Sequence, residues 1–203
     1  MRVRWVDEWE GGFGWLVEEV RGRTSHALVA KGGVWLVDPV DVPGLDERMR
    51  AAGEPAAVIQ LLDRHKRDSA ELAQRYGIPH LCLPQGAEDT PFTFLPLVQM
   101  RGWRESALWW EEQRVLAVAD ALGTLPYFLG RGDRLGVHPW LRLAPPAALG
   151  LVEPGHVLCG HGEGVHQDAA RALREALATS RRRMPGAAWN GLRFLVRALK
   201  RPS

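Results

Sequence analysis

A framework of disulfides, a membrane-spanning segment and a secretory signal are not expected from this sequence. Only two cysteines, Cys82 and Cys159, occur among the 203 residues, which excludes a framework of disulfides. No apolar run approaches the roughly 20 residues that a membrane-spanning helix needs. Arg2 and Arg4 are not followed by the apolar stretch of a secretory signal. We therefore predict a cytoplasmic protein without a membrane span.

A strong charge of one sign is missing as well. The 26 basic and 24 acidic residues leave a net charge of +2, which argues against a dedicated nucleic-acid-binding protein. Arginines gather after residue 180, where Trp189 and Leu192 begin a helical pattern of apolar residues. This pattern predicts a basic C-terminal helix at about residues 186–200 that packs on the core. Contact of its arginines with phosphates or an anionic membrane surface is the alternative.

The remaining composition is that of a folded chain, with 46% hydrophobic and 25% charged residues. The length fits one domain over residues 1–203. In the first half, the pattern predicts a β-hairpin over 25–30 and 34–40, a helix over 45–52, a strand over 56–62, a helix over 69–76 and a strand over 80–83. A strand, a helix and a strand in succession imply that part of the sheet is parallel.

The second half shows a different pattern, in which strands follow one another closely. It predicts strands over 92–100, 106–110, 114–119 and 156–159, and a helix over 167–179. Residues 123–149 are rich in glycine, proline and aromatic residues without a sustained period, which indicates a long loop or a pair of short helices.

Polar residues follow directly on four of the apolar strands. Asp38 and Asp120 each end such a run, His161 comes two residues after Cys159, and the polar segment 63–68 follows the strand over 56–62. Ligands of sheet proteins gather at strand ends, so these four positions are expected to share one cleft. Aspartate and histidine together are typical ligands of zinc, manganese or iron.

The order of these features resembles that of the metallo-β-lactamase superfamily. Its motifs are matched by Leu36-Val37-Asp38-Pro39, by the segment 63–69 at the place of the His-x-His-x-Asp-His motif, by the strand 114–120 that delivers a metal-bridging aspartate, and by Gly160-His161-Gly162. The resemblance extends over roughly residues 24–178. It implies a mixed α/β (α+β) fold, a four-layer αβ/βα sandwich, with a hydrolytic metal site at the strand ends.

Several histidines of the family pattern are absent. When Asp68 is matched to the aspartate of the central motif, the three histidine positions hold Arg64, Lys66 and Ser69. The stretch 98–108, where a further histidine is expected, contains none. Positive charge here also disfavours two divalent cations. We therefore predict a diverged member without the dinuclear site.

At most one ion remains, which would be zinc, manganese or iron. Its candidate ligands are Asp68, Asp120 and His161, which are also the candidate catalytic residues, together with His65 if the register shifts. Asp38 is the expected supporting residue, which hydrogen-bonds a ligand rather than the metal.

Each candidate also has a structural interpretation. Asp68 and Glu71 match a capping box for the helix over 69–76, with the Asp68 carboxylate bonded to backbone N–H groups. Asp120 can form a salt bridge with Arg64 or Arg67 in place of a metal.

The sequence thus leaves three hypotheses, and whether the protein is an enzyme stays open among them. The favoured one is a protein that binds a small ligand or a partner in the former metal cleft. The alternative is a mononuclear metal-dependent hydrolase of an ester, thioester or phosphoester, in which His161 is the most important residue. The third, a nucleic-acid-associated protein, has the low net charge against it.

Overall fold

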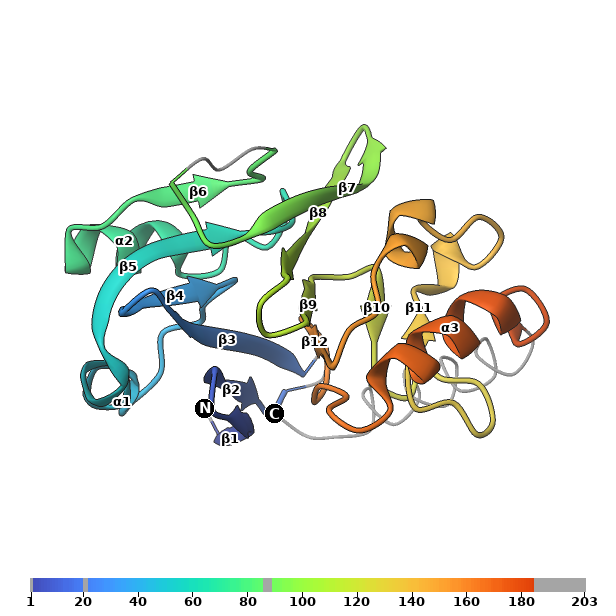
Figure 1. Cartoon of the computed structure of the whole chain (residues 1–203), viewed down its shortest axis with the longest axis horizontal. Coiled ribbons are helices and arrows are strands. Elements are labelled where there is room, and N and C mark those ends of the chain that lie inside the picture. The colour runs from blue at the N-terminus through green and yellow to red at the C-terminus, as the bar shows by residue number, and fades with distance from the viewer. Residues whose placement is uncertain (1, 20–21, 86–88, 185–203) are drawn as a thin grey trace.

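The computed structural model describes residues 2–19, 22–85 and 89–184, whose strands form two main sheets (Figure 1). The first sheet contains, in spatial order, β1 (Val3–Trp9), β2 (Gly12–Val17), β3 (Arg23–Ala30), β4 (Gly33–Val37), β5 (Glu54–Gln60) and β6 (His80–Cys82). Strands β1 to β4 pair antiparallel, whereas β5 is parallel to both β4 and β6. The predicted hairpin and the predicted parallel unit are therefore both present.

Two helices connect the parallel strands and pack on the first sheet. They are α1 (Leu45–Ala52) and α2 (Ser69–Tyr76), and both have the bounds predicted from the sequence. In α1, Leu45 and Met49 lie four residues apart, on one face of the helix, and both are buried. Helix α2 ends at Gly77, whose left-handed φ of 66° lets its N–H bond back to the last turn.

The second sheet has the spatial order β12 (His156–Cys159), β9 (Val115–Val118), β8 (Trp103–Trp110) and β7 (Thr93–Met100). Strands β12 and β9 are parallel, and the other pairs are antiparallel. Helix α3 (Ala169–Thr179) packs against β12 and against the short strand β11 (Gly136–Val137). The segment predicted as a long loop or a pair of short helices contains β10 (Leu122–Gly123), β11 (Gly136–Val137) and two 3-10 turns, η1 (Pro139–Leu141) and η2 (Ala147–Leu151).

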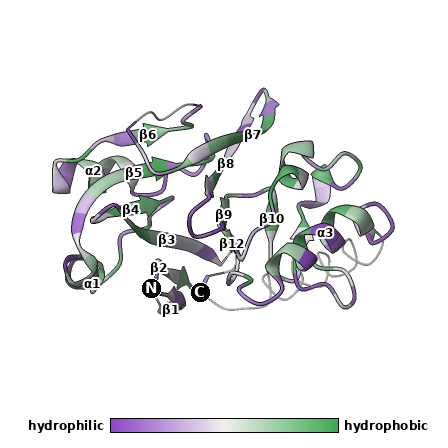
Figure 2. Ribbon diagram, viewed as in Figure 1, coloured by the Kyte–Doolittle hydropathy of each residue, from purple (hydrophilic) through white to green (hydrophobic). Residues whose placement is uncertain are grey.

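Alternating residues of the central strands separate two hydrophobic clusters. Trp35 and Ile59 point to the cluster shared with the second sheet, whereas Leu36 and Val58 point to the cluster under α1 and α2. This period of two is what a strand buried on both faces requires. Figure 2 shows hydrophobic colours on β4 in this interior position. The layers are therefore helix, sheet, sheet and helix, which confirms the predicted sandwich.

Two parts of the prediction differ from the structure or lie outside it. Strands β1 and β2 were not predicted, because β1 is half exposed and β2 is interrupted by Gly12 and Gly14, so neither has a clear apolar alternation. The predicted basic helix at about residues 186–200 lies outside the described residues. None of the helices in the described part of the chain has the length and apolar character needed to cross a membrane.

Candidate metal centre

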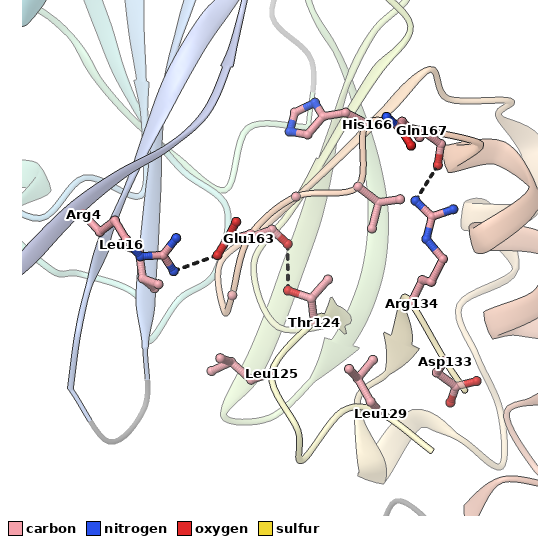
Figure 3. A pocket seen from close by; sticks show the side chains of 13 residues that line it. Arg4, Leu16, Thr124, Leu125, Leu129, Asp133, Arg134, Glu163, His166 and Gln167 are labelled. Atoms are coloured by element: carbon pink, nitrogen blue, oxygen red, sulfur yellow. Dashed lines mark hydrogen bonds and ion pairs between the residues drawn. The ribbon is translucent and has the colours of Figure 1, made fainter. Parts of the chain in front are cut away.

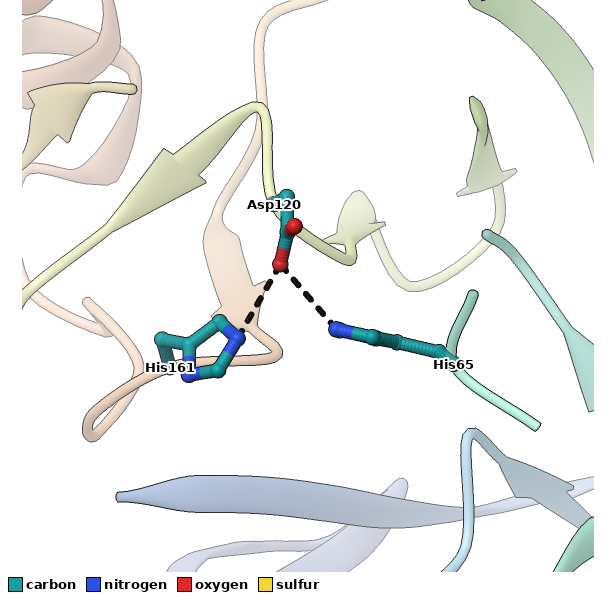
Figure 4. A group of neighbouring side chains, drawn as sticks. All are labelled: His65, Asp120 and His161. Atoms are coloured by element: carbon teal, nitrogen blue, oxygen red, sulfur yellow. Dashed lines mark ion pairs between the residues drawn. The ribbon is translucent and has the colours of Figure 1, made fainter. Parts of the chain in front are cut away.

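Three side chains from three strand ends meet at one point (Figure 4). His65 follows β5, Asp120 follows β9 and His161 follows β12. The Asp120 Oδ1 atom lies 3.1 Å from His65 Nε2 and 3.0 Å from His161 Nε2. All three atoms lie within 4.8 Å of one another, which is close enough for a single metal ion. Their side chains are only 9–12% exposed.

Asp120 Oδ1 is the unusual atom of this group. It is buried and has no hydrogen-bond partner among the described residues, although two imidazole nitrogens lie within about 3 Å of it. Buried polar atoms are rarely left without a partner. Burial raises the pKa of Asp120, but the neighbouring His161 and His65 hold it well below its ordinary value. An ionised oxygen close to two imidazole nitrogens is a donor set that can hold a divalent cation.

Asp38 fixes the orientation of the His65 ring through the ring nitrogen that does not face Asp120. Its Oδ2 atom lies 3.1 Å from His65 Nδ1, and its Oδ1 accepts a hydrogen bond from the Leu61 N–H at 2.9 Å. Because a carboxylate accepts, His65 Nδ1 carries the hydrogen and directs Nε2 toward Asp120. This is the supporting role that the resemblance implies for Asp38. Burial and Arg67 lower the pKa of His65, but Asp120 and Asp38 raise it above its ordinary value.

Arg64 occupies the other oxygen of Asp120. Its Nη2 donates to Asp120 Oδ2 at 2.8 Å and its Nε at 3.3 Å. The guanidinium carbon also lies 4.4 Å from the ring centroid of Trp103. One of the two salt bridges considered from the sequence is therefore present, and it leaves only Oδ1 of Asp120 for another partner.

Arg67 does not bond a carboxylate. Its buried guanidinium donates to the backbone carbonyls of Thr24 and Asp38 at 2.6 Å and of Gly160 at 3.1 Å. Burial lowers its pKa, and the charges of Asp38 and Asp120 oppose this. Arg67 therefore connects the ends of β3, β4 and β12 through hydrogen bonds to their backbone, and it does not form a salt bridge with Asp120.

The loop that carries His161 is fixed at several backbone atoms. Thr24 donates from its N–H to the Gly160 carbonyl and from its hydroxyl to the Gly162 carbonyl, at 2.9 and 2.7 Å. The Thr124 N–H donates to the His161 carbonyl at 3.1 Å. Gly162 has a φ of +94°, and a Cβ there would lie 2.2 Å from the Thr124 hydroxyl, so the close approach needs glycine.

Asp68 does not join the other predicted ligands. Arg67 has a left-handed φ of 44°, and the Asp68 carboxylate after it accepts a hydrogen bond from the Asp41 N–H at 2.8 Å. Asp68 stands at the N-cap position of α2, but its side chain makes no capping hydrogen bond, so the predicted capping box is wrong. The register that brings His65 to the site is the shifted one, and the position of Asp68 gives no support to its role as a ligand.

Glu105 is a site residue that was not predicted from the sequence. It is fully buried on β8, and its Oε1 accepts hydrogen bonds from the N–H groups of Ala119, Asp120 and Ala121 at 3.1, 2.9 and 2.8 Å. Burial and the charge of Asp120 raise the pKa of Glu105 to about 7, while the bonds from Ala121 and Trp103 oppose the rise. Glu105 fixes the turn that carries Asp120. An acidic residue inside a buried strand was the available signal.

His138 was missed because it matches no ligand spacing. Its ring centroid lies 4.7 Å from that of Trp103, and its Nδ1 accepts a hydrogen bond from the Trp140 N–H at 3.3 Å. Burial lowers the pKa of His138 to about 4, and the positive charge of Arg64 acts in the same direction. His138 is therefore a neutral imidazole at the side of the site.

A second group of histidines surrounds Asp7. Asp7 Oδ2 lies 3.1 Å from His26 Nε2, and Asp7 Oδ1 lies 3.0 Å from His166 Nε2 and accepts the Gly164 N–H at 2.7 Å. His166 Nδ1 in turn lies 2.8 Å from His156 Nδ1. Within the described residues, only the His65–Asp120–His161 group brings three ligand atoms close enough for one ion. The Asp7 group is a hydrogen-bonded network.

A cavity is lined on one side by residues 162–167 of the loop after β12 (Figure 3). It measures about 600 Å³, and Leu16, Leu125 and Leu129 form much of its apolar wall. Its charged residues have partners: Arg4 pairs with Glu163 at 2.7 Å, Asp133 pairs with Arg183, and Arg134 donates to the Gln167 carbonyl at 2.8 Å. None of the three residues of the candidate metal centre lines this cavity.

Comparisons with known proteins give matches in structure alone. No protein-family model matches the chain, and no curated protein matches its sequence. The metallo-β-lactamase FIM-1 from Pseudomonas aeruginosa in its mono-zinc form has a TM-score of 0.60 at 10% identity, over 89% of this chain and 97% of that chain. A metallo-β-lactamase from Hirschia baltica has a TM-score of 0.57 at 11% identity, over 89% and 98%. TTHA1623 in a di-iron-bound form has a TM-score of 0.51 at 18% identity, over 71% and 90%.

These similarities confirm the fold that the resemblance implied. The chain has the metallo-β-lactamase fold, and identities of 10–18% fit a diverged sequence. At such identities the comparisons establish the fold and leave the chemistry to the residues of this chain.

Proposed function

We propose that this protein of metallo-β-lactamase fold binds one divalent metal ion and hydrolyses an ester, thioester or phosphoester. The ligands would be His65 Nε2, Asp120 Oδ1 and His161 Nε2. The observation that carries the proposal is the buried Asp120 Oδ1, which faces two imidazole nitrogens and has no hydrogen-bond partner among the described residues. Three protein ligands with an open fourth position are typical of catalytic zinc.

The residues of the chain supply orientation and charge balance at this site. A bound divalent ion would lower the pKa of water and polarise the substrate oxygen. Asp38 fixes the His65 ring, and Glu105 fixes the backbone on either side of Asp120. Such supporting hydrogen bonds typically contribute about 10- to 100-fold to metal affinity or activity.

Arg64 is the reason to propose one ion rather than two. It forms a salt bridge with Asp120 Oδ2, the oxygen that a second metal would need. Two unit positive charges about 4 Å apart repel by about 4 kcal/mol at an effective dielectric constant of about 20. The guanidinium therefore replaces the charge of a second cation. FIM-1 was crystallised in a mono-zinc form, so the fold accommodates a site with one metal.

The second candidate is the ligand-binding protein that the sequence favoured. The Arg64–Asp120 salt bridge favours it, because it already neutralises part of the site without a metal. The two candidates differ in whether zinc binds.

Elemental analysis and zinc titration of the purified protein distinguish them. We expect one zinc ion per chain in the wild type and none in Asp120→Asn, with turnover measured on 4-nitrophenyl acetate, a thioester and bis(4-nitrophenyl) phosphate. Two ions per chain would contradict the single site. A failure to bind zinc at micromolar concentration would leave the ligand-binding protein as the better account.

We also propose a cytoplasmic location and a single domain over residues 1–203. Both cysteines are free, with Cys159 buried in β12 and Cys82 exposed, which suits a reducing compartment. Fractionation of cells would test the location, and limited proteolysis would test the domain.

A further inference from the structure

Two exposed side chains flank a buried indole beside the candidate metal centre. Trp103 is only 3% exposed, whereas the Arg64 side chain is 40% exposed and Trp140 is 79% exposed. Arg64 lies over the Trp103 ring at 4.4 Å, and the ring centroids of Trp103 and Trp140 lie 6.2 Å apart. A cation and an indole are thus presented to solvent next to Asp120, to which Arg64 is bonded.

Arg64 has hydrogen-bonding capacity that the described residues leave unused. Its Nε and Nη2 donate to Asp120, but Nη1 has no hydrogen bond among the described residues. Stacking on Trp103 and the bond to Asp120 together fix the plane of the guanidinium. A fixed, planar guanidinium whose Nη1 is free is suited to a carboxylate, because it offers a charge-assisted hydrogen bond in a fixed direction.

Trp140 is held in place by its own short turn. His138 precedes η1 and accepts a hydrogen bond from the Trp140 N–H, and the His138 N–H donates to the Ala121 carbonyl at 3.0 Å. Ala121 directly follows Asp120, so the turn is tied to the residue that carries the centre. Indole is a large apolar surface with one polar group, and such groups are enriched where proteins bind ligands.

We propose that Arg64 and Trp140 form the substrate-binding rim of this site. The rim selects a substrate that carries a carboxylate next to a flat apolar group. The carboxylate would bond to Arg64 Nη1, and the flat group would lie against the Trp140 indole. This inference rests on the proposed function for the scissile bond, but the binding of the anion does not require turnover.

Isothermal titration calorimetry of the zinc-loaded protein with 2-naphthoate and with its neutral analogue 2-naphthamide tests the rim. We expect 2-naphthoate to bind at least about tenfold more tightly, as a charge-assisted hydrogen bond provides. Arg64→Gln should abolish this preference, and Arg101→Gln should keep it, because Arg101 is an exposed arginine in the β7–β8 turn. Equal binding of the two compounds by the wild type would overturn the inference.

The aromatic part of the rim has its own pair of variants. Trp140→Ala should weaken both compounds by about two- to tenfold, which is the range for one aromatic contact. Leu151→Ala should not weaken them, because Leu151 is also 79% exposed but lies in η2. Unchanged binding in Trp140→Ala would remove the indole from the rim.

Two further outcomes separate this inference from its alternatives. A preference for 2-naphthoate that persists in Arg64→Gln and vanishes on removal of zinc would assign the carboxylate to the metal and overturn the role of Arg64. A dimer that Trp140→Ala converts to a monomer, with no binding of 2-naphthoate, would assign the exposed indole to a second copy of the chain. If no ester is hydrolysed but the preference depends on Arg64, the proposed hydrolysis fails and the rim stands.

Discussion

Asp120 and Asp7 are each a buried carboxylate between two histidines, yet their surroundings differ. Both oxygens of Asp7 are bonded, one to His26 and the other to His166 and the Gly164 N–H. Asp120 has one oxygen bonded to Arg64, while the other faces two imidazoles without a hydrogen bond among the described residues. The same residue types therefore form a closed hydrogen-bonded network in one place and an open set of candidate metal ligands in the other.

The comparison shows that hydrogen-bond geometry, rather than residue type, identifies a candidate metal site. His161 and His166 even belong to the same loop after β12, five positions apart. Burial raises the pKa of Asp7, but the bonds from His166 and His26 hold it well below its ordinary value. Its left-handed φ of 54° is a strained conformation that this network maintains. Asp7 thus fastens β1 to the loop whose first residues carry the candidate centre.

The largest expected effect comes from exchanging the two histidines of that loop for alanine. His161→Ala removes a ligand, so zinc affinity should fall by more than the roughly 100-fold that loss of a supporting residue can cost. His166→Ala should still bind one zinc ion per chain. Competition with a chromophoric chelator measures both affinities. If instead His166→Ala loses zinc and His161→Ala retains it, the two clusters have been assigned the wrong way round.

The next effect concerns the stability that each carboxylate provides. Asp7→Ala leaves two imidazoles and the Gly164 N–H without their acceptor, so the free energy of unfolding should fall by about 3–5 kcal/mol. Asp68→Ala, the matched control, loses one hydrogen bond to the Asp41 N–H and should cost about 1 kcal/mol. Urea denaturation of the metal-free variants measures both. Equal losses would mean that the Asp7 network contributes no more than the single part-buried hydrogen bond of Asp68.

The smallest effects are opposite pH dependences of the two clusters in metal-free protein. Burial and Arg67 lower the pKa of His65, but the carboxylates of Asp120 and Asp38 raise it above its ordinary value overall. Protonated His65 therefore stabilises the folded protein below the unfolded pKa of about 6.5, and this stabilisation is lost as the pH rises through the folded pKa. Burial and His166 lower the pKa of His156, so its neutral form is favoured and stability falls as pH drops below about 6.5.

Two glutamine variants test these signs by urea denaturation between pH 5 and 9. The stability difference between wild type and His65→Gln should be larger at pH 6 than at pH 9. The difference between wild type and His156→Gln should change in the opposite direction. Parallel pH profiles for the two variants would show that the clusters do not differ in this way.

Much of the fold could be predicted because the spacing of apolar residues and the positions of glycines along the chain mark the helices and buried strands. Helix α1 lies between Gly44 and Gly53, and helix α2 is followed by Gly77, so their bounds were predicted correctly. The buried run before Asp63 predicted β5 for the same reason. Strands β1 and β2 were missed because their stability comes from pairing with each other and with β3, which their own residues do not reveal.

The sequence by itself determined the buried strands and the strand ends that carry Asp38, Asp120 and His161, because burial on two faces imposes a pattern on the residues themselves. The order of those features, through its resemblance to the metallo-β-lactamase superfamily, implied the sandwich. Only the tertiary structure decided that His65 rather than Asp68 reaches the centre. Arg67 adopts a left-handed backbone conformation and turns the chain between these two residues. Such a change in one backbone dihedral angle cannot be recognised from the spacing of apolar residues. Glu105 likewise acquires its role only when β8 brings it beneath the turn of Asp120, from 15 residues away.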